Sequence, residues 1–170
     1  MDREETRRKL EEIIETISDQ VENGPGWYAV WVGDQIGPAG PVPPFIYTVA
    51  LTRSGLPELI ISGHLEPELG QKILSDVILR LRSGEISYEA VPASGLCLSG
   101  LLENDLDIFL RRVTGAGQHS RLPLALEYQR RQGGKISDVL SLQIVLPDQE
   151  NLFPWEGGHS GRPQQEELWN

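Results

Sequence analysis

Residues 43–61, PPFIYTVALTRSGLPELII, constrain the fold more than any other stretch of the chain. Within residues 45–51 both alternating faces are largely apolar, which indicates a strand that lies inside its sheet and is covered on both sides. The prolines before this strand cannot donate ladder hydrogen bonds, and residues 52–55, TRSG, have the composition of a turn. Because residues 59–62 follow at once, we predict an antiparallel hairpin.

Hydrophobic periodicity predicts the remaining elements. Residues 1–23 place their apolar side chains on one helical stripe, which is typical of an amphipathic helix. Residues 107–113 are expected to form a strand, although they also satisfy a helical period. The other expected elements are helices at residues 66–84 and 122–131, strands at 27–32, 86–91, 96–102 and 139–146, a surface loop at 33–44, and an irregular acidic arm at 147–170 that packs on the domain.

Together these segments predict a single α+β domain over residues 1–170. We expect a mostly antiparallel sheet of about six strands with about three helices, one of which, at residues 66–84, covers one face of the hairpin. A chain of 170 residues that is 39% hydrophobic is long enough to bury such a core.

Charge and cysteine content narrow the partners and the location. The net charge of −10 argues against a nucleic-acid or anionic-membrane surface, because phosphate binding needs clustered Lys and Arg. No run approaches the length of a membrane helix, and the charged N-terminus does not resemble a signal peptide. The single Cys97 fits a reducing compartment, so we expect a cytoplasmic protein.

Catalytic and metal-binding motifs are not recognisable in the sequence. His64, His119 and His159 are far apart and share no spacing with a second metal ligand, so no metal site is predicted. The glycines of the 33–44 loop lack the lysine of a phosphate-binding loop, and no nucleophile elbow is present. Cys97 stands in an apolar strand and is expected to be an inert core thiol. We therefore predict a non-catalytic protein and assign no cofactor.

Polar residues inside the apolar strands are the best candidates for a ligand site. A buried polar group must form hydrogen bonds, either within the protein or to a ligand. Aromatic rings in the C-terminal arm could stack on the same ligand. The candidate ligand-binding residues are Tyr47, Thr48, Thr52, Glu58, His64, Gln143 and Trp155.

The chain resembles a family of bacterial and phage proteins called domain of unknown function 4262. The matching blocks are Gly26-Trp27, PFIYTVALT at residues 44–52, GLPELII at 55–61 with Gly63, LQIVLPD at 142–148, and FPWE at 153–156. Two positions differ, because the family commonly has Gly where Ala50 stands and Trp where Leu146 stands. We expect the first difference to leave less room beside the strand. The resemblance implies a shared fold and no reaction.

Three functions remain as hypotheses. The first is a module that binds or sequesters a small polar or nucleotide-like ligand between the Tyr47 strand and the Trp155 arm, in phage–host conflict for example. The second is a flavin-dependent enzyme on a split β-barrel, which a strand–turn–strand of this form resembles. The third is an acidic protein–protein interaction subunit. Four tryptophans exceed what a small core hides, so we also expect a homodimer or a higher homo-oligomer.

Overall fold

The computed structural model describes residues 2–169, in which four α-helices, two short 3-10 helices and eight strands follow one another. Met1 and Asn170, at the ends of the expected helix and arm, lie outside the described residues. In chain order the elements are α1 (Arg3–Asn23), β1 (Tyr28–Val32), β2 (Gln35–Gly37), β3 (Gly40–Val42), β4 (Phe45–Val49), η1 (Leu51–Ser54), β5 (Glu58–Ser62), α2 (Pro67–Arg82), β6 (Leu96–Leu98), β7 (Ile108–Arg112), α3 (Gly115–Arg121), α4 (Pro123–Arg131), η2 (Ile136–Asp138) and β8 (Ser141–Val145).

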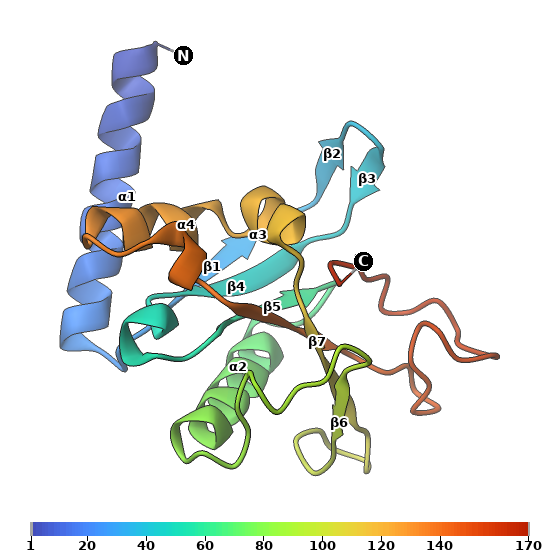
Figure 1. The fold of residues 1–170 in the computed structure, drawn as a ribbon. Coiled ribbons are helices and arrows are strands. Elements are labelled where there is room, and N and C mark those ends of the chain that lie inside the picture. The colour runs from blue at the N-terminus through green and yellow to red at the C-terminus, as the bar shows by residue number, and fades with distance from the viewer. Residues whose placement is uncertain (1, 170) are drawn as a thin grey trace.

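Six of these strands form one sheet in the order β1-β4-β5-β8-β7-β6 (Figure 1). The predicted hairpin is confirmed, because β4 and β5 pair antiparallel with Tyr47 opposite Ile60. The expectation of a mostly antiparallel sheet needs correction: β5 and β8 run parallel, so the sheet is mixed, while its other pairings are antiparallel. A long connection that includes α2 separates β5 from β8, and parallel neighbours require a crossover of this kind.

Helices cover both faces of the sheet (Figure 1). On one face α2 packs its buried side chains, such as Ile73 and Val77, against residues of the hairpin that include Ile46 and Leu59, as predicted. The opposite face is covered by α1 and α4, which pack on the side of the sheet that carries Tyr47. The central strands are therefore apolar on both faces because each face meets a helix layer.

Four segments differ from expectation. The loop at residues 33–44 contains the hairpin of β2 and β3, which projects from the body of the domain in Figure 1. Residues 86–91 form turns rather than a strand, and the strand expected at 96–102 is limited to β6, where Cys97 is exposed and not in the core. The additional helix is α3, whose amino end is capped by Thr114 Oγ1, which accepts a hydrogen bond from Gly117 N.

Residues 146–169 contain no helix or strand and are held to the sheet by side chains. The buried Asp148 accepts hydrogen bonds from the backbone N–H groups of Glu150, Leu152 and Ser160. The Gln165 side chain bonds both backbone groups of Leu146, at 2.8 and 2.9 Å. These bonds replace the backbone ladder that an irregular segment lacks.

Candidate functional site

A buried carboxyl group lies where the central hairpin ends. Glu58 begins β5 and is only 1% exposed. Its Oε1 accepts hydrogen bonds from the backbone N and the hydroxyl of Thr52 at 3.0 and 2.9 Å, and its Oε2 accepts one from Thr48 Oγ1 at 2.6 Å. We call Thr48, Thr52 and Glu58 the Glu58 network.

The local backbone explains how these three residues meet. The β4–β5 pairing ends at Tyr47 and Ile60, and beyond it Leu59 N donates to the Thr48 hydroxyl at 2.8 Å. Ala50 then adopts a left-handed conformation with φ +83°, which turns the chain into η1 and places Thr52 beside Glu58. Glycine is the residue that adopts this conformation without steric cost. A glycine at this position, which the resemblance leads us to expect, would be favoured by this backbone conformation.

Burial and hydrogen bonding have opposite effects on the Glu58 carboxyl group. Removal from water raises its pKa from an ordinary value of 4.5 to about 6, and the hydrogen bonds from Thr48 and Thr52 only partly offset this effect. A carboxyl group with a pKa near 6 exchanges its proton close to neutral pH. Glu58 itself has no contact with open space, so any effect on a bound molecule passes through Thr52.

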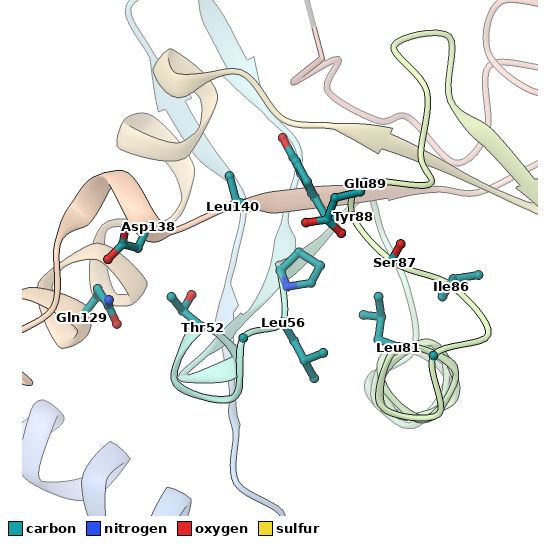
Figure 2. A pocket seen from close by; sticks show the side chains of 13 residues that line it. Thr52, Leu56, Leu81, Ile86, Ser87, Tyr88, Glu89, Gln129, Asp138 and Leu140 are labelled. Atoms are coloured by element: carbon teal, nitrogen blue, oxygen red, sulfur yellow. The ribbon is translucent and has the colours of Figure 1, made fainter.

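Thr52 also lines a cavity of about 320 Å³. Figure 2 shows Thr52 and Leu56 at its base, Gln129 and Asp138 on one side, and Leu81, Ile86 and Ser87 on the other. The walls therefore come from η1 and the turn after it, the end of α2, the turns that follow α2, α4 and η2. The lining residues are Thr52, Gly55, Leu56, Pro57, Leu81, Gly84, Ile86, Ser87, Tyr88, Glu89, Gln129, Asp138 and Leu140.

Arg112 on β7 fixes the wall formed by the turns after α2. Its Nη2 donates hydrogen bonds to the carbonyl oxygens of Tyr88 and Glu89 at 3.1 and 3.3 Å. Its guanidinium carbon also lies 4.5 Å from the centroid of the Tyr88 ring, a cation–π contact. Residues 86–91 are not a strand because these carbonyl groups bond to a side chain instead of a neighbouring strand.

The polar side chains that line the cavity are either acidic or uncharged. Glu89 and Asp138 contribute carboxylates, Gln129 an amide, and Thr52, Ser87 and Tyr88 hydroxyl groups. None of the lining side chains is Lys, Arg or His. The cavity is therefore suited to a neutral or positively charged molecule and unfavourable for a phosphate group.

Three of the seven predicted site residues, Thr48, Thr52 and Glu58, come together in the Glu58 network. Tyr47 is buried on the face of the sheet covered by α1 and α4, where its hydroxyl accepts a 3.4 Å hydrogen bond from Leu124 N. Burial raises the pKa of Tyr47 to about 12, with a smaller contribution from the charge of Glu58. The Tyr47 phenol is thus a neutral core group.

The remaining three predicted residues lie elsewhere. His64 is exposed and its Nε2 is 3.3 Å from Asp34 Oδ1, beside a second hollow of about 260 Å³. Gln143 uses both ends of its amide within the protein: Nε2 donates to Glu166 O at 2.6 Å, and Oε1 accepts from Leu168 N at 3.0 Å. Gln143 therefore anchors the C-terminal segment.

Trp155 belongs to an aromatic cluster formed by Phe109 of β7 with Phe153, Trp155 and Trp169 of the C-terminal segment. Its ring centroid lies 4.8 Å from Phe109, 5.3 Å from Phe153 and 5.7 Å from Trp169. None of these rings lines the cavity beside Thr52. The structure thus separates Trp155 from the Glu58 network.

Sequence reasoning missed Tyr88, Gln129 and Asp138 as cavity residues. The assignment of residues 86–91 to a strand concealed the first, although Gly84, Pro92 and Gly95 around that segment are turn signals. Gln129 and Asp138 carry no local signal, because they reach the cavity only through the packing of α4 and η2. Within residues 2–169, no group of three or more His, Cys, Asp or Glu side chains is placed to hold a metal ion.

Comparisons with known proteins identify one matching family. Among the helices of the described chain, none has both the length and the apolar character needed to cross a bilayer. No curated protein and no solved structure matches the chain. The model of one family, Domain of unknown function (DUF4262), matches residues 21–160 of the 170. This range includes β1–β8 and the whole Glu58 network, and the chain therefore belongs to the DUF4262 family.

Proposed function

We propose that the protein is a non-catalytic module that binds one small polar molecule in the cavity beside Thr52. The observation that carries this proposal is the link between the cavity and a buried carboxyl group, since Thr52 lines the cavity and its hydroxyl donates a hydrogen bond to Glu58 Oε1. A hydroxyl group held in this way keeps its lone pairs free to accept a hydrogen bond from a ligand. The volume of about 320 Å³ lies within the range of small-molecule sites.

The lining chemistry supports a narrower ligand class than the sequence does. A nucleotide phosphate in this cavity would meet the carboxylates of Glu89 and Asp138, and no basic side chain is among the lining residues. We therefore narrow the nucleotide-like ligand to a molecule without phosphate, such as a nucleoside or an amine. Tyr88 offers a ring for stacking, and Gln129 offers both a donor and an acceptor.

The flavin hypothesis has less support than ligand binding. The phosphate of a flavin mononucleotide would face the same two carboxylates. The six-stranded sheet is also open, with β1 and β6 at its two ends, whereas a split barrel closes its strands around a core. A flavin enzyme would therefore need a site other than this cavity.

The biological role stays a prediction. We propose that the module sequesters its ligand in the cytoplasm, in phage–host conflict for example. The unpaired, exposed Cys97 is compatible with a reducing compartment.

Exposed apolar side chains support a second proposal, that of self-association or a protein partner. Ile36 at the β2–β3 hairpin is 90% exposed, and Trp31 and Trp155 are 45% and 40% exposed. Burial of these groups between two copies would remove apolar surface from water. Light scattering of the purified protein is expected to give twice the monomer mass of 18.9 kDa, and a monomer at all concentrations would contradict dimerisation.

Ligand binding is tested in two steps. Native mass spectrometry of the purified protein, compared with the denatured spectrum, would reveal a retained small molecule. A thermal shift assay with adenosine and with spermidine then tests the two ligand classes, since a ligand that binds the folded state raises the melting temperature. We expect a saturable rise with at least one of them.

Matched variants assign any binding to the cavity. Leu140→Trp places a large ring at the cavity rim from an exposed position and should abolish the rise in melting temperature. Leu79→Trp makes the same change at an exposed position of α2 outside the lining and should leave it intact. The proposal fails if no retained molecule and no saturable shift are found, or if both variants respond alike.

A further inference from the structure

Arg111 on β7 is surrounded by three aromatic rings. Its guanidinium carbon lies 4.5 Å from the ring centroid of Trp155, 5.1 Å from that of Trp169 and 5.3 Å from that of Phe109. The negative faces of aromatic rings attract a cation, most strongly when water is excluded. The three rings thus hold the guanidinium group in one place.

Within residues 2–169, the donors of this guanidinium group have no acceptor. Arg111 Nε is buried without a hydrogen-bond partner, and among residues 2–169 no hydrogen bond or ion pair involves the Arg111 side chain. Arg121, on α3, differs in that it makes two hydrogen bonds to the carboxylate of Glu166 at 2.7 and 2.8 Å. A partly desolvated cation without a counter-charge is unfavourable, and aromatic faces offset only part of this cost.

The residues around Arg111 are held by the fold and form a preorganised surface. Asp148 fixes the segment that carries Trp155 through bonds to Leu152 N and Ser160 N. Gln143 bonds Leu168, next to Trp169. Trp155 remains 40% exposed, so part of its ring is open to a molecule from solution. Binding would therefore require little ordering of the protein.

We propose that Arg111 and Trp155 form a second ligand site, which binds an anionic group carried on a planar ring. The carboxylate or phosphate of such a ligand accepts hydrogen bonds from the Arg111 guanidinium, and its ring stacks on Trp155 or Trp169. Guanidinium donors match the oxygens of both anions. This ligand class is opposite in charge to the one that suits the acidic cavity beside Thr52, so the two sites take different ligands.

Three small probes of similar shape test the site by tryptophan fluorescence. Benzoate and phenyl phosphate each carry an anion on a ring, while benzamide presents the ring without the charge. We expect a saturable change in emission with the two anions, weakened by added salt, and none with benzamide. Tighter binding of phenyl phosphate would assign the site to phosphate-bearing ligands, and tighter binding of benzoate to carboxylates.

Substitutions separate this site from other causes of the signal. Arg111→Gln removes the charge and should weaken the binding of both anions about tenfold or more, the usual effect of a lost charged hydrogen bond. Arg111→Lys keeps the charge but loses the planar guanidinium group, so it should also weaken the binding of both anions. This variant serves as the test if Arg111→Gln does not fold. Trp31→Phe changes the other exposed tryptophan and should leave the affinity unchanged.

Three results would overturn the proposal: an equal response to benzamide, unchanged affinity in both Arg111 variants, or no saturable signal with either anion. Leu140→Trp should bind benzoate and phenyl phosphate normally, because Leu140 lines only the acidic cavity. If the Arg111 proposal fails, the proposed ligand site beside Thr52 is unaffected. If the Thr52 proposal fails, the Arg111 site is unaffected.

Discussion

Glu58 and Arg111 represent two ways in which this protein shields a charged side chain from water, completely at Glu58 and in part at Arg111. Glu58 accepts three short hydrogen bonds, from Thr48 and Thr52, and is closed on every side. Arg111 is surrounded by the rings of Phe109, Trp155 and Trp169 and uses none of its donors within the described chain. The first arrangement satisfies the charged group with the protein's own atoms, and the second leaves it incomplete.

This difference separates stability from binding. Removing a partner from a fully satisfied buried network leaves unpaired donors and destabilises the fold strongly. Replacing Arg111, whose donors form no hydrogen bonds within residues 2–169, removes only its contacts with the aromatic rings. We therefore expect substitutions at Glu58 to act mainly on folding and substitutions at Arg111 to act mainly on ligand affinity.

The largest effect is expected for Glu58→Ala. The change leaves Thr52 N and the two threonine hydroxyls without their acceptor, so the free energy of unfolding should fall by about 3 kcal/mol in urea titrations. Glu89→Ala, at the exposed rim of the cavity, is the matched control and should change it by less than about 0.5 kcal/mol. Similar losses for the two variants would contradict the structural role of the network.

The pH dependence of stability should be almost as large. Because the folded pKa of Glu58 is raised from 4.5 to about 6, the carboxyl group binds its proton more tightly in the folded state. The contribution of Glu58 to the free energy of unfolding is therefore greatest below pH 4.5. It declines as the pH rises through about 6, by about 2 kcal/mol in total. In Glu58→Gln this decline should disappear, whereas the same decline in the variant would assign it to another group.

A smaller effect on stability is expected for Arg111→Gln. The variant loses cation–π contacts with three rings, and we expect the free energy of unfolding to fall by about 1 kcal/mol. Urea denaturation monitored by circular dichroism measures this value independently of the tryptophans. A loss as large as that of Glu58→Ala would mean that Arg111 is a structural group and that the contrast between the two regions is wrong.

The smallest effect concerns the turn that places Thr52 beside Glu58. Ala50 has φ +83°, where a Cβ atom costs about 1–2 kcal/mol. Glycine removes this strain, but it also gives the unfolded chain more conformational entropy, which cancels part of the stabilisation. Ala50→Gly should therefore stabilise the protein by about 0.5 kcal/mol, seen as a higher midpoint of urea unfolding. Ala29→Gly, inside β1, should destabilise it, and a loss of stability in both variants would contradict the strain at Ala50.

Local patterns predicted much of the fold, and nonlocal pairing limited the rest. The hairpin of β4 and β5 and the helices α1, α2 and α4 follow from apolar periodicity and turn residues in their own segments. The parallel neighbour of β5 does not, because Ser141 and Glu58, which pair across that seam, are far apart in the sequence. Helix α3 was missed because it has no apolar period and is held by its Thr114 cap and by Gln118, whose amide bonds to Val139 O and Ser141 Oγ.

The candidate site shows the same division. Thr48, Thr52 and Glu58 are neighbours across one hairpin, so their meeting could be predicted from strand and turn positions. Gln143 is equally buried, yet its partners lie in the C-terminal segment, which periodicity cannot place. Burial of a polar residue therefore indicates that it has partners, but the sequence does not say whether those partners belong to the protein or to a ligand.

The position of β8 has a consequence for biosynthesis. Among residues 2–169 this strand comes last in sequence, yet it lies between β5 and β7 in the middle of the sheet. While the ribosome is still translating, the emerged β5 presents a bare, apolar edge of the kind that pairs with other nascent chains. Polypeptides released before residue 141 are thus expected to aggregate or to depend on chaperones, since the segment that completes the sheet from within has not yet been made.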